Sequence, residues 1–117
     1  MADESNKLLT TNQTQLAGRL LERGALRYTP AGIAVLEFLL GHVSQQIEAG
    51  TSRTVECEMA CIAVGTPALL LAEGQQGTSV LVSGFLAARS LKHRTPVLHV
   101  TTIEFVEGIE NGIQTKR

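Results

Sequence analysis

Glycines inside two strand-like segments are the feature that most constrains the fold of this chain. Gly18 lies inside the segment 13–21, and Gly84 lies inside the segment 78–89. Glycine weakens a regular strand and is common where a strand bulges or bends sharply. A small, strongly coiled barrel needs such bends, so the two glycines favour a barrel over a flat sheet.

Three further segments carry strand patterns, over 33–43, around 55–61 and over 96–106. The first is apolar on both faces, which indicates a mostly buried strand. The second alternates between apolar and acidic residues, so one of its faces is expected to be buried and the other solvated. The polar residues 45–52 between these two segments are expected to form a loop.

One helix is expected, over residues 66–73. Thr66 is a good N-cap, Pro67 suits the first helical position, and Gly74 ends the pattern. The predicted order is therefore strand, strand, strand, short helix, strand, strand. Together with the bends, this order predicts an all-β fold: a five-stranded Greek-key barrel of the OB type with the helix between strands 3 and 4.

One domain is expected over residues 12–107. The chain has 117 residues, of which 44% are hydrophobic and 18% charged, and this composition excludes an intrinsically disordered protein. Residues 1–11 and 108–117 lack an apolar period and are expected to be flexible tails. The apolar runs are too short to cross a bilayer and the polar N-terminus has no signal core, so a cytoplasmic protein without a membrane partner is expected.

The two cysteines, Cys57 and Cys61, are expected to be buried, unpaired thiols. On one strand, four residues at about 3.3 Å each place them roughly 13 Å apart. That separation is too large for a disulfide. Their C-x-x-x-C spacing matches neither a zinc knuckle nor a redox motif. A metal site with His42 or His99 is the alternative, but no second tight ligand pair is present, so we expect no metal and no cofactor.

The sequence also argues against an enzyme. It contains no G-x-S-x-G elbow, no P-loop and no H-E-x-x-H motif. Asp3 is its only aspartate. Cys57 with His42 or His99 would supply a nucleophile and a base, but the apolar strand face expected for Cys57 disfavours a thiolate.

The charges are nearly balanced, with 10 Lys+Arg against 11 Asp+Glu. Bulk charge alone therefore cannot attract nucleic acid, and a binding face must come from charges sorted to one side. OB barrels bind oligonucleotides on the face of strands 2 and 3 and through the loops that join strands 1 and 2 and strands 4 and 5. Candidate DNA contacts near these places are Arg89, Lys92, Arg94, Arg53, Arg27 and Tyr28.

Each candidate has a structural alternative. The basic loop that holds the first three can be a solvated hairpin loop. Arg53 can form a surface salt bridge with a nearby Glu, which contributes little. Arg27 can serve a dimer interface, and Tyr28 can pack over the barrel or a dimer seam.

Single-stranded nucleic acid is held by cations along its phosphates and by aromatic rings under its bases. The aromatic residues other than Tyr28 lie in apolar runs and are expected in the core: Phe38, Phe85 and Phe105. Glu56 and Glu58 are interpreted as a solvated strand face, or as a patch that repels DNA and receives a basic partner.

Three stretches resemble the bacterial single-stranded-DNA-binding proteins. They are Asn12-Gln13-x-x-Leu16-x-Gly18-Arg19-Leu20 with Leu26-Arg27-Tyr28-Thr29-Pro30-Ala31-Gly32, and Gly77-Thr78-x-Val80-x-Val82-x-Gly84-Phe85-Leu86. The short length fits a smaller relative. The chain resembles the family of primosomal replication protein N, the OB-fold accessory proteins of bacterial replication restart. The resemblance covers roughly residues 12–107, and the Arg-Tyr-Thr-Pro-x-Gly turn is its most specific part.

The resemblance implies a non-enzymatic homodimer, joined along its early strands, that binds single-stranded DNA. It also implies a bridge between the restart helicase of the primosome and the downstream loader protein. The positions that match aromatic DNA contacts of stronger-binding relatives are Thr51 and Glu56. A second hypothesis is a protein-interaction adaptor with the same fold and little DNA binding. The near-neutral charge favours the adaptor, whereas the basic loop favours DNA binding.

Overall fold

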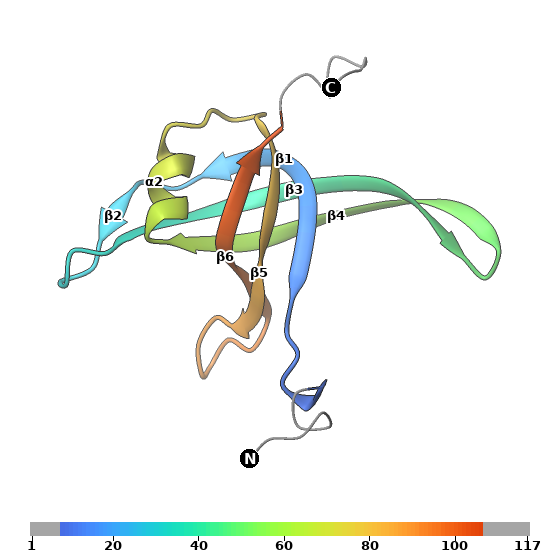
Figure 1. Cartoon of the computed structure of the whole chain (residues 1–117), viewed down its shortest axis with the longest axis horizontal. Helices are drawn as coiled ribbons and strands as arrows, with labels where there is room; N and C mark the ends of the chain where they lie inside the picture. Colours follow the sequence, from blue (N-terminus) through green and yellow to red (C-terminus); the bar gives the residue numbers. More distant parts are fainter. Residues whose placement is uncertain (1–7, 107–117) are drawn as a thin grey trace.

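Six strands and the helix α2 build the chain from residue 14 to residue 105. The computed structural model describes residues 8–106. In chain order the elements are β1 (Thr14–Arg23), β2 (Arg27–Tyr28), β3 (Ala34–Glu48), β4 (Thr51–Val64), α2 (Thr66–Ala72), β5 (Ser79–Ala88) and β6 (Pro96–Phe105) (Figure 1). The two-residue β2 adds to the five expected strands. The helix α2 lies between the third and fourth of those five, as predicted.

Strand β1 closes the sheet into a barrel. The strand order is β1-β5-β6-β4-β3-β2, and β1 also pairs with β3. The first part of β1, up to Arg19, pairs antiparallel with β5, and the part from Arg19 to Arg23 pairs antiparallel with β3. Strands β4 and β6 run parallel. This arrangement is the closed, five-stranded OB barrel that the sequence predicts.

Gly84 lies at a sharp bend of β5. The β5–β6 register shifts between Ser83 and Gly84, which marks a bulge. A Cβ atom at Gly84 would lie 1.8 Å from the carbonyl oxygen of His99. The bend expected at this glycine is confirmed, and the close approach of two backbones explains why no side chain fits there.

Gly18 allows a second close approach, between β1 and β3. A Cβ atom at Gly18 would lie 2.2 Å from the carbonyl oxygen of Gly41. The register shift of β1 itself comes a little later, between Leu20 and Glu22. Gly18 is therefore the point at which β1 comes close to β3, and the irregularity of β1 follows it.

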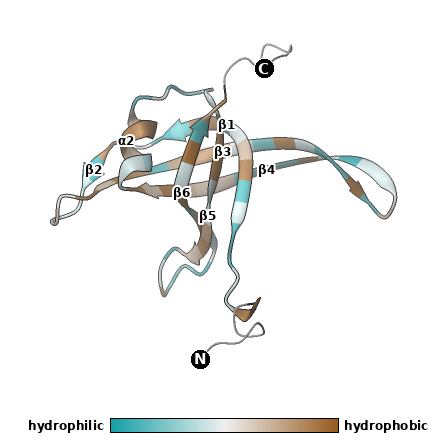
Figure 2. Cartoon of the chain, viewed as in Figure 1, coloured by the Kyte–Doolittle hydropathy of each residue, from teal (hydrophilic) through white to brown (hydrophobic). Residues whose placement is uncertain are grey.

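The core fills the barrel and extends beneath α2. Figure 2 shows hydrophobic segments on β3, β5 and β6 where these strands run through the barrel. Phe38 and Cys61 are buried in it, as predicted. The largest fully buried side chains come from five strands and the helix: Leu20, Leu36, Leu40, Leu71, Leu98, Val80, Val82 and Cys61. Burial raises the pKa of the Cys61 thiol to about 12, so this thiol stays protonated at neutral pH.

Three residues that were expected in the core lie at the surface instead. Phe85 is 41% exposed, and its ring stacks on His99 outside the barrel. Phe105 is 39% exposed because it ends β6, beside the helix α2. Cys57 is a free, exposed thiol, because this part of β4 runs out of the barrel and has no layer beneath it. Cys61, by contrast, is buried, and neither cysteine forms a disulfide.

The prediction of a loop over residues 45–52 is wrong. Strands β3 and β4 stay paired through this segment to the pair Glu48 and Thr51, and the turn consists of Ala49 and Gly50. Both turn residues have positive φ, 52° and 79°, as in the two-residue turns that match the twist of a hairpin. The hairpin projects to the right in Figure 1. Residues 45–52 are exposed on both of its faces, so their sequence shows no alternation of apolar and polar residues.

The N-cap of the helix α2 lies one residue earlier than expected. Gly65, with φ of 83°, occupies the N-cap position, and Thr66 is already helical. At the other end, the Arg23 guanidinium donates hydrogen bonds to the carbonyl oxygens of Leu71, Ala72 and Gly74. A cation from β1 thus satisfies the free carbonyls at the end of the helix. Within residues 8–106, the helical segments are too short or too polar to cross a membrane.

The start of the barrel is anchored by Asn12. Its side-chain amide donates to the carbonyl oxygen of Leu86 at 2.8 Å, and its oxygen accepts from the Leu86 N–H at 2.9 Å.

The tail expected over residues 108–117 lies outside the described residues, as do residues 1–7 of the expected N-terminal tail.

We expect Gly84→Ala to destabilise the protein by about 3 kcal/mol or more, because its methyl group meets backbone that cannot rotate away. The matched control is Gly32→Ala. Gly32 has a φ of +85° and open space around it, so it carries a backbone penalty of only about 1–2 kcal/mol. Urea unfolding of both variants gives the comparison. Equal losses would show that β5 does not need glycine at its bend.

Candidate nucleic-acid interface

Glu37 connects two of the loops that were expected to contact DNA. Its neighbours on β3, Leu36 and Phe38, are buried, so Glu37 points out of the barrel, and its side chain is 39% exposed. Its Oε2 lies 3.2 Å from Nη2 of Arg27 in β2, and its Oε1 lies 3.2 Å from Nη1 of Arg89 after β5. We call Arg27, Glu37 and Arg89 the Glu37 cluster.

The two guanidinium groups hold the pKa of Glu37 below its usual value. The hydrogen bond from Arg89 has the largest effect. Partial burial acts in the opposite direction, and the hydrogen bond from Arg27 lowers the pKa again. Glu37 is therefore ionised at neutral pH, and two cations with one anion leave the cluster with one positive charge.

The basic loop between β5 and β6 is a compact turn. The Ser90 N–H donates to the carbonyl oxygen of His93, and the His93 N–H donates to the Ser90 hydroxyl, both at 3.0 Å. Lys92 and Arg94 are exposed, and within residues 8–106 neither forms an ion pair. The turn thus presents two solvated cations next to Arg89.

Arg53 lies apart from the other candidates. It is the third residue of β4, in the hairpin that projects away from β2 and α2 (Figure 1). Its guanidinium contacts the carboxylate of Glu48 across the end of the hairpin, at 2.5 Å. The surface salt bridge that was the alternative for Arg53 is therefore present. Thr51 and Glu56 belong to the same hairpin, here called the hairpin arm, and are exposed.

Tyr28 follows Arg27 in β2 and is 59% exposed. It pairs with Ala34 of β3, and the turn after it is held by a hydrogen bond from the Gly32 N–H to the carbonyl oxygen of Thr29, at 2.8 Å. Successive strand residues point to opposite faces, so Tyr28 points away from the side on which Arg27 contacts Glu37, and its exposed ring is open to a ligand there.

Phe85 and His99 form an aromatic pair that the sequence interpretation missed. Their ring centroids are 5.1 Å apart and their planes differ by 9°. The strand register places Glu37, Ile62, His99 and Phe85 in one row across β3, β4, β6 and β5. A hollow of about 490 Å³ lies over the part of this row from Ile62 to Phe85, and Val64, Val100 and Thr101 also line it. The outer face thus has cations at one end and stacked rings at the other.

Two sequence signals point to this face. Glu37 is the one acid within the apolar segment 33–43, a position at which an ionised side chain needs a partner. Phe85 directly follows the bend at Gly84, where the alternation that sorts buried from exposed residues is interrupted. Neither signal identifies the partner residue, because Arg27, Arg89 and His99 all come from other segments and meet Glu37 or Phe85 only in the folded barrel.

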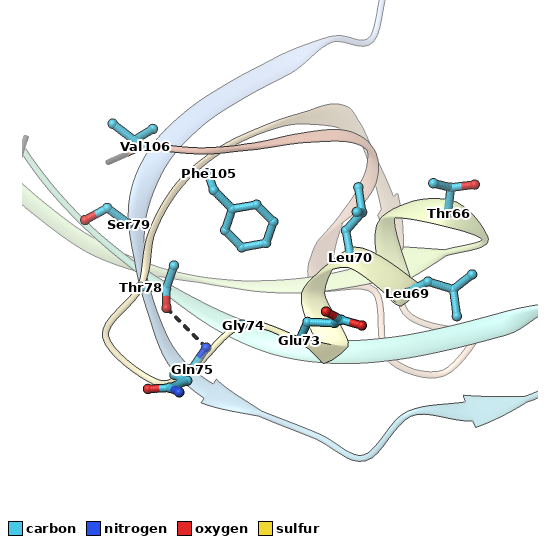
Figure 3. Close-up of a pocket in the computed structure, with 10 residues that line it drawn as sticks. All are labelled: Thr66, Leu69, Leu70, Glu73, Gly74, Gln75, Thr78, Ser79, Phe105 and Val106. Atoms are coloured by element: carbon cyan, nitrogen blue, oxygen red, sulfur yellow. Dashed lines mark hydrogen bonds between the residues drawn. The ribbon is translucent and has the colours of Figure 1, made fainter. Parts of the chain in front are cut away.

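A larger hollow of about 820 Å³ lies between α2 and the end of β6. Figure 3 shows Leu70 and the ring of Phe105 facing this space, with Glu73 at its rim. Its charged lining residue is an acid, so the hollow does not suit a phosphate. Among residues 8–106, no group of three His, Cys, Asp or Glu side chains is placed to hold a metal ion.

Comparison with known proteins agrees with this architecture. Residues 12–102 match a family described as another single-strand binding protein family. The chain is 50% identical over 76 residues to replication restart protein PriB of Bordetella pertussis, covering 65% of this chain and 71% of that protein. It is 36% identical over 92 residues to PriB of Nitrosomonas europaea, covering 79% and 85%.

Solved structures show the same fold. PriB from Ralstonia solanacearum superposes with a TM-score of 0.73 at 36% identity, covering 82% of this chain and 98% of that one. A variant of the single-stranded DNA binding protein from Thermus aquaticus gives a TM-score of 0.70 at 27% identity, covering 84% and 51%.

The geometry of the Glu37 cluster predicts the titration of its carboxylate. We expect the pKa of Glu37 to lie below that of an ordinary glutamate. Arg89→Ala should raise this pKa more than Arg27→Ala, since the hydrogen bond from Arg89 lowers it the most. Because the folded pKa is depressed, the stabilisation by Glu37 is present above the unfolded pKa and lost as pH falls through the folded one. Carboxyl ¹³C shifts followed against pH measure this, and an equal effect of the two variants would contradict it.

Proposed function

Because the chain belongs to the single-strand binding protein family, we propose that it is a non-enzymatic, single-stranded-DNA-binding factor of bacterial replication restart. The observation that carries the proposal is the meeting of cations from two loops above the face of β3 and β4. Arg27 and Arg89 meet at Glu37, and the loop of Arg89 adds the exposed Lys92 and Arg94. Cations in these loops of an OB barrel are suited to follow the phosphates of a strand.

Exposed aromatic residues near these cations give the bases a place to stack. Tyr28 is exposed beside Arg27, and Phe85 and His99 form the stacked pair at the other end of the face. A base stacked on an aromatic ring contributes about 1–3 kcal/mol and requires no particular sequence. We therefore propose binding without sequence preference, with the strand running from the loop cations toward the aromatic pair. Arg53 would contact only a strand long enough to reach the hairpin.

We propose that two copies join along β1. The β1 residues before Arg19 pair with β5 on one side, while their other edge has no strand partner among residues 8–106. On that edge the carbonyl oxygen of Ala17 accepts a hydrogen bond from His42. Backbone groups alternate between the two sides of a strand, so the N–H and C=O of Gln15 face the same open edge. An open edge of this kind is a template for a second strand.

The wider role proposed here is a cytoplasmic bridge between the primosomal helicase and the loader protein that acts after it. The support is the similarity to proteins named for replication restart. The exposed acids Glu56 and Glu58 on the arm of β4 offer a negative surface for a basic protein partner.

A protein-interaction adaptor with little DNA binding is the second candidate. One observation favours it: three of the six candidate contacts, Arg27, Arg53 and Arg89, already pair with glutamates. DNA must displace these carboxylates, whereas a protein partner can use other surfaces.

Replacing Arg89, Lys92 and Arg94 together with Ala should weaken binding to labelled oligo-dT. The slope of log K against log salt should fall by up to about 2, since each single-strand phosphate contact contributes about 0.7. Arg53→Ala is the control, because it removes a cation from the separate hairpin. Fluorescence titrations at two salt concentrations measure both. Unchanged affinity of the triple variant would place the site elsewhere, and no binding by the unmodified protein at low salt would leave the adaptor.

Sizing should give about 25 kDa, twice the 12.5 kDa of one chain. Gln15→Pro should reduce the mass to that of one chain while the barrel stays folded, because proline removes a donor from the open edge and leaves the pairing with β5 intact. Light scattering measures the mass, and circular dichroism shows whether the barrel is folded. A folded Gln15→Pro dimer would place the interface on another surface.

A further inference from the structure

The geometry points to a single phosphate site between Arg27 and Arg89 that Glu37 occupies in the free protein. Glu37 then acts as a built-in competitor of single-stranded DNA. This inference rests on the proposed function, because its ligand is the phosphate of a DNA strand. Beyond that function, we infer that Glu37 lowers the affinity for single-stranded DNA although it makes no contact with the DNA itself.

The contacts of Glu37 match those that a phosphate would make. Each of its two carboxylate oxygens meets a different guanidinium, both at 3.2 Å. A phosphodiester likewise carries two anionic oxygens on one atom, and arginine is well suited to either group. Two guanidinium groups that fit a carboxylate from opposite sides are therefore arranged for a phosphate at the same position.

The cluster is open to solvent, so an external anion can reach it. The side chains of Arg27 and Arg89 are 56% and 48% exposed, and Glu37 is 39% exposed. Ion pairs at this exposure are individually weak. A strand can therefore exchange its phosphate for the carboxylate without opening the barrel.

The two loops keep their shape without the ion pairs. Arg27 lies in β2, which pairs with β3, and the Gly24 N–H donates to the backbone carbonyl of Glu37 at 2.8 Å. The loop of Arg89 has its own hydrogen bonds, between Ser90 and His93. Glu37 is therefore not needed to hold the arginines near each other, which leaves its carboxylate in competition with the ligand.

The test is Glu37→Gln, which keeps the shape of the side chain and removes its charge. We expect this variant to bind oligo-dT about three- to tenfold more tightly, and with a steeper salt dependence, as two more cations become available. The control is Glu104→Gln. It makes the same charge change near the C-terminal end of β6, outside the Glu37 cluster. Glu104 is exposed and has no ion pair within the described part of the chain, so its change should be less than about twofold.

A second background separates competition from net charge. With Arg27 and Arg89 both replaced by Ala, Glu37→Gln should have no further effect on affinity, because no site remains for the carboxylate to block. Thermal melting confirms that each variant is folded. An equal gain from Glu37→Gln and Glu104→Gln, or weaker binding by Glu37→Gln, overturns the inference while the proposed function stands. If neither the unmodified protein nor Glu37→Gln binds oligo-dT at low salt, the proposed function itself fails.

Discussion

The structure depends on β1 changing its partner strand at Arg19. This residue pairs with Ser79 of β5 and with Gly41 of β3, and the change closes the barrel. It is possible only because the backbone at Gly18 can approach that of Gly41, where any side chain would collide with a carbonyl oxygen. Closure in turn brings the loops that follow β1 and β5 to the same side of β3. The meeting of Arg27 and Arg89 at Glu37 is thus a consequence of two glycines that lie away from the site.

The parts of the fold that could be predicted are those with a local cause. The bend at Gly84 follows from a position that tolerates no Cβ, and the short helix follows from the Pro67 and Gly74 signals at its ends. The hairpin arm could not be predicted in this way. Residues 45–52 form strands whose two faces meet water, so burial imposes no alternation on them. Cys57 illustrates the opposite case: its segment does alternate between apolar and acidic residues, but at Cys57 the strand has no core to face, so the thiol is exposed.

The candidate site could be predicted only as a set of separate cations. The position of the basic loop after the fourth expected strand follows from element order, and its exposed lysine and arginines follow from composition. The pairing of Arg89 with Glu37 could not be predicted, because the two residues are 52 apart in the sequence and meet only through closure of the barrel. The aromatic pair was missed because hydrophobicity alone assigns Phe85 to the interior. Its ring instead completes an outer face by stacking on His99.

Under the proposed function, the pairing of arginines with glutamates would let a chain with a net charge of −1 select a polyanion. A carboxylate attached to the same fold acts at a high effective concentration, so a free monovalent anion in solution competes with it poorly. A DNA strand has a different advantage. The exposed Lys92 and Arg94 can hold one stretch of phosphates, and this contact raises the local concentration of the next phosphate beside Arg89. Selection then rests on the number of linked phosphates, because only a connected chain of anions gains from both the free and the occupied cations.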